Sequence, residues 1–212
     1  MALYLRLIIW VREMFLKKNN FYLLLIFVFI NIFSLSVESE DSESYYISQV
    51  LEYLSNNNEF SSNFLQFNNN SYQEGKLFLK KERIRIEYTS PSKLIIVIKK
   101  NQVMYHNVEL EEVEYFNPKN TVVKTLYDFF YNKIFFNDVV FIHEKNALVF
   151  SKKTMLDDEI NIISVIFEES PLNLKKIKIE NSQGIMTFTI LDPNYNPELD
   201  DSLFSLANPL IS

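Results

Sequence analysis

The chain has 212 residues, 48% of them hydrophobic and 15% aromatic, which is enough for one domain with a sizeable core. Its two glycines, Gly75 and Gly184, exclude a glycine-rich phosphate loop, and the absence of cysteine excludes disulfide scaffolds, thiol catalysis, cysteine-based zinc sites and lipid attachment through an N-terminal cysteine. The formal net charge of −6 argues against nucleic-acid binding, because clustered lysine and arginine are needed to displace counterions from phosphate.

Residues 14–36 have the pattern of an export signal. Lys17 and Lys18 precede an apolar run from Phe21 to Phe33, and small residues follow at Ser34 and Ser36. The run is shorter than the roughly 20 apolar residues of a spanning helix, which favours cleavage after Ser36 over a retained anchor. The segment before Met14 fits no such pattern, so an unused upstream start and a genuine extension both stay open. The part after the signal carries a charge of −9, and we interpret it as a soluble exported protein.

An acidic leader and one helix are predicted to follow the signal. Residues 37–44 are predicted to be a flexible leader. The stretch 45–57 then places apolar residues on one helical face, namely Ile47, Val50, Leu51 and Leu54. Covering a sheet and binding a partner both require such a stripe, so both interpretations stay open.

Strands are predicted next, from alternation of apolar and polar residues. The segments 60–67, 72–80 and 83–88 alternate, with Ile84, Ile86 and Tyr88 on one face of the last. Residues 94–98 form a continuous apolar run before a strand over 102–110. Between them, Lys100 and Asn101 stand where a tight hairpin requires a residue tolerant of positive φ.

The second half of the chain contains a short helical segment and four more predicted strands. Helical spacing is found at Leu126, Phe129, Phe130 and Ile134, in a segment too apolar for a free surface loop. Strands are predicted over 147–153, 161–170, 172–184 and 185–192, with a turn at 181–184.

The C-terminal residues are predicted to leave the sheet and fold back on it. Pro193 and Pro197 lack the amide hydrogen that a ladder requires, so they are predicted to break it. Leu203, Phe204 and Leu206 would then pack a terminal segment against the sheet.

Catalytic and metal-binding patterns are sparse. His106 and His143 are the only histidines, and each is interpreted as an ordinary sheet residue. Paired carboxylates lie in predicted turns or loops, where charge is simply solvated: Glu111-Glu112, Asp157-Asp158 and Asp200-Asp201. No serine or threonine has the flanking glycines of a nucleophile elbow. We therefore predict neither an enzyme nor a metal or cofactor site. The surplus of apolar residues indicates a curved antiparallel sheet whose concave face is filled by side chains, a helix or a ligand.

Three motifs then support a family resemblance over residues 46–209. "FSSNFLQ" contains Phe60, Phe64 and Gln66, "EGKLFLKKERIRIEYTSP" is a glycine-led strand that enters a basic corner, and "NPELDDSLF" precedes Pro209. In this order they resemble the periplasmic outer-membrane lipoprotein carrier family LolA. Members usually have Arg-Pro at the basic corner, where this chain has Lys81-Glu82, and an Asp-Gly hairpin in place of Lys100-Asn101.

The resemblance implies a mainly β (α+β) fold, an incomplete antiparallel β-barrel with a helical lid over an apolar cavity, in a single domain over 45–212. It implies a carrier of lipoprotein acyl chains that works with an inner-membrane lipoprotein-releasing ABC transporter, as a monomer, with an outer-membrane receptor as an open point. The implied cavity residues are Phe64, Leu77, Leu79, Ile84, Ile86, Tyr88, Ile96 and Tyr105. The implied lid residues are Leu126, Phe129 and Phe130, and Lys81 would latch the lid through its backbone with a point charge in place of a guanidinium fork.

Three other functions are weighed against this one. The receptor of the same fold is itself a lipoprotein and requires a cysteine that this chain lacks. A periplasmic structural or assembly protein would instead pair through its sheet edges without lipid cargo. An exported hydrolase is disfavoured by the isolated histidines.

Overall fold

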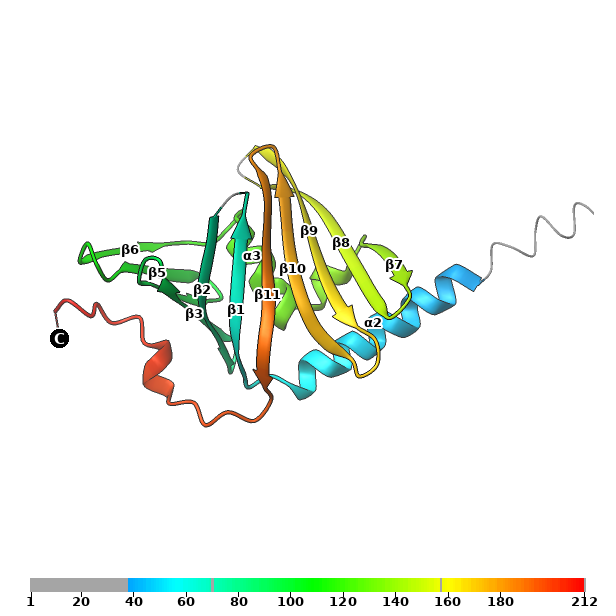
Figure 1. Cartoon of the computed structure of the whole chain (residues 1–212), viewed down its shortest axis with the longest axis horizontal. Coiled ribbons are helices and arrows are strands. Elements are labelled where there is room, and N and C mark those ends of the chain that lie inside the picture. Colours follow the sequence, from blue (N-terminus) through cyan, green and yellow to red (C-terminus); the bar gives the residue numbers. More distant parts are fainter. Residues whose placement is uncertain (1–37, 70, 157, 212) are drawn as a thin grey trace, which may run out of the picture. The chain divides into compact units, whose positions relative to one another are not determined.

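The structure is a computed structural model that describes residues 38–69, 71–156 and 158–211, and the predicted signal peptide lies outside these residues. The strands belong to one compact unit that starts at Tyr46. They form a single antiparallel sheet in the order β6-β5-β4-β3-β2-β1-β11-β10-β9-β8-β7 (Figure 1). The sheet is not closed, because β6 and β7 stand at its two ends. The mainly β fold with a partly closed sheet is therefore confirmed.

Two meanders make up the sheet. The first contains β1 (Phe60–Asn68), β2 (Ser71–Lys80), β3 (Arg83–Ser90), β4 (Leu94–Lys99), β5 (Gln102–Asn107) and β6 (Glu112–Phe116). The second contains β7 (Val140–Glu144), β8 (Ala147–Leu156), β9 (Glu159–Glu168), β10 (Asn173–Asn181) and β11 (Gly184–Asn194). They join where β1 pairs with β11, with Phe64 opposite Ile190.

The connection between the meanders carries the helix α3 (Val122–Tyr131) and the 3-10 helix η1 (Lys133–Phe136). In Figure 1, α3 lies behind the plane of β1 and β11. Strand alternation sends one set of side chains toward these helices, where they form the main buried core with Phe129 and Phe135. The second half of the helix α2 (Glu38–Asn56) adds the fully buried Val50 to the same core.

The opposite face of β4 and β5 is covered by the C-terminal segment (residues 195–211). Its 3-10 helix η2 (Asp201–Phe204) brings Phe204 into a second buried cluster with Val97 and Met104. Arg85 Nη1 donates to the carbonyl of Leu203 at 2.7 Å, which fixes the backbone of the segment. The prediction that this segment folds back on the sheet is confirmed.

Several local predictions were wrong. The helix α2 begins at Glu38, within the predicted flexible leader; that stretch contains neither Gly nor Pro, so nothing stops the helix from propagating toward its N-terminus. Strand β11 continues through Pro193, because the ladder to β1 shifts register there and proline is tolerated at such an irregularity. Lys100 and Asn101 form the β4–β5 turn without a positive φ. A turn with negative φ at both positions suits residues that carry a Cβ.

Candidate functional site

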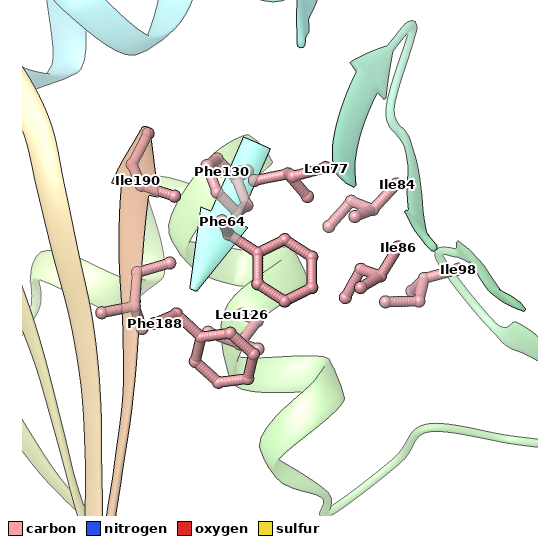
Figure 2. A pocket seen from close by; sticks show the side chains of 10 residues that line it. Phe64, Leu77, Ile84, Ile86, Ile98, Leu126, Phe130, Phe188 and Ile190 are labelled. Carbon is pink, nitrogen blue, oxygen red and sulfur yellow. The ribbon is translucent and has the colours of Figure 1, made fainter. Parts of the chain in front are cut away.

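An apolar cavity of about 40 Å³ lies between the sheet and α3. Ten side chains line it, and all of them are hydrocarbon or phenyl groups (Figure 2): Phe64, Leu77, Ile84, Ile86, Ile98, Leu126, Phe130, Ile177, Phe188 and Ile190. They come from β1 to β4, from the helix α3, and from β10 and β11, so the helix and both meanders contribute. Such a surface can exclude water but offers no group for acid–base chemistry.

The ring of Phe64 occupies the middle of this cavity in Figure 2. It lies across β2 at Gly75, its partner in the β1–β2 ladder. A Cβ on Gly75 would stand 2.5 Å from Phe64 Cζ and 2.3 Å from the carbonyl oxygen of Glu87. The missing side chain of Gly75 is therefore what lets the ring turn inward, and the ring is held between Tyr88 and Phe188 at centroid distances of 5.3 Å and 5.8 Å.

A small polar network stands next to Phe64 along β1. The Tyr88 hydroxyl donates to Gln66 Oε1 at 2.7 Å, and Gln66 Nε2 donates to Gln73 Oε1 at 3.0 Å. Burial raises the pKa of Tyr88 above its usual range, so this hydroxyl stays protonated and continues to donate. The buried amide of Gln66 is thus satisfied within the protein.

The helix α3 is a lid whose adjacent phenylalanines face different surroundings. Its N-terminus is capped by Thr121, whose hydroxyl accepts from the Lys124 amide at 3.4 Å. Phe130 and Leu126, one turn apart, cover the cavity. Phe129 is only 1% exposed and packs against Phe135, with ring centroids 5.3 Å apart. It anchors the lid in the core and does not line the cavity.

The lid is tied to the sheet by tyrosines. Tyr131 donates to the carbonyl of Arg83 at 2.9 Å. Burial raises the pKa of Tyr127 to about 12, and the neighbouring Glu82 adds to the rise. Both hydroxyls therefore stay protonated at neutral pH.

The expected latch residue has a different partner. Lys81 and Glu82 have φ values of 48° and 58°, as in a hairpin turn of type I′, and proline cannot adopt such a φ at position 82. The Lys81 side chain is 64% exposed and its ammonium lies 3.9 Å from Asp201. Within the described part of the chain it makes no hydrogen bond to the lid backbone. The Lys81 side chain lies near the acidic C-terminal segment instead, and the lid is tied to this corner by a different contact, the hydrogen bond from the Tyr131 hydroxyl to the carbonyl of Arg83.

The structure brings together about half of the predicted site residues. Phe64, Leu77, Ile84, Ile86, Leu126 and Phe130 lie on one cavity. Leu79 is buried in the core, Tyr88 and Ile96 pack against the core, and Tyr105 lies opposite Ile96 in the β4–β5 ladder. Sequence reasoning missed Ile98 of β4 and the lining residues of the second meander, which are Ile177, Phe188 and Ile190. Met186, Phe188 and Ile190 alternate with two threonines along one predicted strand, and this alternation was the sequence signal that could have identified Phe188 and Ile190.

Polar residues elsewhere form structural pairs. His143 Nε2 lies 2.9 Å from Glu169 Oε2, and the Tyr46 hydroxyl donates to the other oxygen of Glu169 at 2.7 Å. His106 is buried within the sheet. Over the described residues, no three histidine or acidic side chains gather at distances suited to a metal ion. Likewise, none of the helices found in those residues has the length and apolar character to span a membrane.

Comparisons with known proteins were made on sequence and on structure. No curated protein matches the chain. Among solved structures it is similar to an uncharacterized conserved protein from Thermus thermophilus, at 7% identity and a TM-score of 0.49, over 74% of this chain and 91% of that one. It is also similar to MucB in the Pseudomonas aeruginosa MucA/MucB complex, at 13% identity and a TM-score of 0.44, over 76% of this chain. The chain spans 62% of that MucB chain.

The family comparison covers the region described above. A model of the outer membrane lipoprotein carrier protein LolA matches residues 55–207. These residues include every strand of the sheet, the lid α3 and the C-terminal helix η2. Because the match spans the sheet, the lid and all of the cavity, this chain belongs to the LolA family.

Proposed function

We propose that the protein is a periplasmic chaperone that binds the acyl chains of lipoproteins released from the inner membrane and carries them to the outer membrane. The observation that supports this most is the cavity lined by hydrocarbon and phenyl groups under a helical lid. Its implied partners are acylated lipoproteins, an inner-membrane lipoprotein-releasing ABC transporter and an outer-membrane receptor. The proposed role is not enzymatic.

The energetic need for such a carrier follows from acyl-chain hydration. Leaving an acyl chain in water costs on the order of 0.8 kcal/mol per CH₂ group. A chain of the length found in membranes therefore cannot cross an aqueous compartment without cover. An apolar cavity removes this cost without any change in covalent chemistry.

The size of the cavity indicates how such a ligand would bind. Its 40 Å³ correspond to about three water-sized spheres of roughly 10–15 Å³ each, which is far too little for an acyl chain. Binding must therefore displace side chains such as Leu126 and Phe130 that now fill the space. This displacement opposes ligand binding, so the net affinity stays low enough for the acyl chain to be released to a membrane or receptor.

Photo-crosslinking tests the proposal in the exported protein. Phe188 lines the cavity, whereas Tyr72 is exposed at the end of β2, and both are aromatic positions that accept p-benzoylphenylalanine. We expect light to attach lipoproteins at position 188 and not at position 72, and native mass spectrometry after purification without detergent to show the acylated adducts. Equal cross-linking at both positions, or a clean ligand-free mass after incubation with lipoprotein-bearing membranes and the release machinery, would reject the carrier role.

The open sheet edges favour a second candidate, an assembly protein that pairs with another chain through an edge strand. On the edge strand β7, Val140 is 62% exposed and Ile142 is also exposed, and unpaired backbone groups at such an edge can accept a further strand. A stable complex with a protein partner that contains no lipid, lost in a Val140→Pro variant, would support this function over the carrier role.

A further inference from the structure

A groove of about 300 Å³ adjoins the lid on the side of α2. Its walls come from three places: Leu51, Leu54 and Ser55 of α2 with Asn58 after it, the β2–β3 turn at Lys81 and Glu82, and the residues from Phe129 to Lys133 at the end of the lid. Its volume is several times that of the apolar cavity between the sheet and α3. Its apolar walls are leucine and phenylalanine side chains, and its rim carries lysines.

Phe130 is the side chain that the groove and the cavity share. It lines both spaces, and it is half-buried where its neighbour Phe129 is fully buried. Figure 2 shows its ring beside Leu77 and Ile190 at the margin of the cavity. Turning this one ring out of the way would join the two spaces.

The backbone on either side of Phe130 is held in place. Phe129 is locked into an aromatic cluster, with its ring 5.3 Å from that of Phe135. Tyr131 is bonded to the carbonyl of Arg83 at 2.9 Å, and the Asn132 amide donates to Asp128 O at 2.8 Å. The lid helix is therefore fixed at this end. A rotamer change of Phe130 leaves these contacts in place, whereas a swing of the helix away from the sheet breaks the Tyr131–Arg83 hydrogen bond.

The rim of the groove has charges suited to the polar end of an acylated chain. Lys81 and Lys133 both line the groove, and Glu82 is the acidic residue among the lining side chains. The Lys81 ammonium is 3.9 Å from Asp201 and stays largely exposed, so it is accessible at the rim. Ammonium groups can donate hydrogen bonds to the ester and amide carbonyls that link acyl chains to a lipoprotein. An acyl tail in the groove would thus have apolar walls, and its carbonyl end would lie at the rim.

We propose that this groove is the entrance through which acyl chains reach the cavity, with the Phe130 ring as its gate and Lys81 and Lys133 at its mouth. The inference rests on the proposed carrier function and adds a route to it. In this arrangement the lid helix stays docked while a single side chain opens the path.

The absence of cysteine allows a direct test with the mature protein. Ser55→Cys places a unique thiol on the groove, and Thr125→Cys places one on the same lid but in a separate surface hollow lined by Thr121 and Lys152. Each variant is labelled with a polyethylene-glycol maleimide, and uptake of the fluorescent fatty acid cis-parinaric acid is followed by stopped flow. We expect the label at position 55 to slow association at least about tenfold and the label at position 125 to leave the rate within a factor of about two.

The outcomes separate the route from the function. Equal slowing by both labels, or slowing by the label at 125 alone, overturns the entrance while leaving acyl binding intact. Failure of the unlabelled wild-type protein to bind the probe refutes the carrier function, and the entrance with it. A Phe130→Ala variant adds an independent check: its association rate should rise with its lid still folded, as judged by circular dichroism, and an unchanged rate excludes Phe130 as the gate.

Discussion

We predict that truncating Phe129 lowers the free energy of unfolding more than truncating its neighbour Phe130, because Phe129 anchors the lid in the core and Phe130 only covers the cavity. Phe129 is 1% exposed, and its ring has neighbours at centroid distances of 4.7 Å (Phe130) and 5.3 Å (Phe135). Removing a fully packed phenylalanine side chain from a core costs about 3–5 kcal/mol. Phe130 borders two spaces that are already empty, so its truncation loses fewer contacts and creates less new cavity. We expect its cost to be near the lower end for an apolar side chain, about 1–2 kcal/mol.

Urea unfolding of the two alanine variants measures this difference. The only tryptophan is Trp10, which precedes the predicted cleavage site after Ser36, so far-UV circular dichroism is the suitable probe for the mature protein. With a urea dependence of about 2 kcal/mol per molar, Phe129→Ala should lower the midpoint by roughly 1.5–2.5 M and Phe130→Ala by less than about 1 M. Equal losses, or a larger loss for Phe130→Ala, would refute the division of the lid into an anchor and a cover.

Three further perturbations test other parts of the site. Gly75→Ala should destabilise the protein by about 1–3 kcal/mol in thermal unfolding, because its Cβ meets a β3 carbonyl oxygen at 2.3 Å; a neutral result would mean that the strands adjust freely. Gln66→Leu should cost about 1–3 kcal/mol, because it leaves the Tyr88 hydroxyl without its acceptor; combining it with Tyr88→Phe should recover part of this loss, and strict additivity would contradict the network. A hydrogen bond from Arg83 holds the pKa of Asp201 below its ordinary value. Its contribution to stability is therefore full above the unfolded pKa of about 3.9 and is lost as the pH falls through the lower folded value. The protection factors of the amides in the C-terminal segment, which correct for the slower intrinsic exchange in acid, should fall at pH 3 and, in Asp201→Asn, already at pH 7; equal protection of variant and wild type at pH 7 would argue against this tie.

Local sequence patterns were sufficient to place β1 to β5, but they did not predict the edge strands β6 and β7. In β2 and β3 the period of two assigns Leu77, Ile84 and Ile86 to one face, and the structure places all three on the cavity. Their partners across the cavity could not be assigned in this way. Phe188 and Ile190 reach it only because β11 pairs with β1, more than a hundred residues away, and nothing in either strand specifies that partner.

Helical spacing likewise identified the lid but not its orientation. Leu126, Phe129 and Phe130 all fall on one broad apolar stripe, and a stripe of that width touches more than one surface. Which residue faces the cavity depends on where the Tyr131 hydroxyl reaches the β3 backbone, a contact set by the fold. The partner of the Lys81 side chain could not be assigned for the same kind of reason, because Asp201 is remote in the sequence.

The separation of anchor and cover bears on how one protein can be both stable and able to release its ligand. If the same side chains held the lid and filled the cavity, binding an acyl chain would break the contacts that keep the lid on the sheet. The ligand-bound protein would then approach unfolding. Here the buried Phe129 and the bonded Tyr131 hold the helix, while the half-buried Phe130 between them fills the margin of the cavity. Ligand exchange then perturbs one ring whose packing is incomplete, so substitutions at position 130 should change binding rates far more than they change the free energy of unfolding.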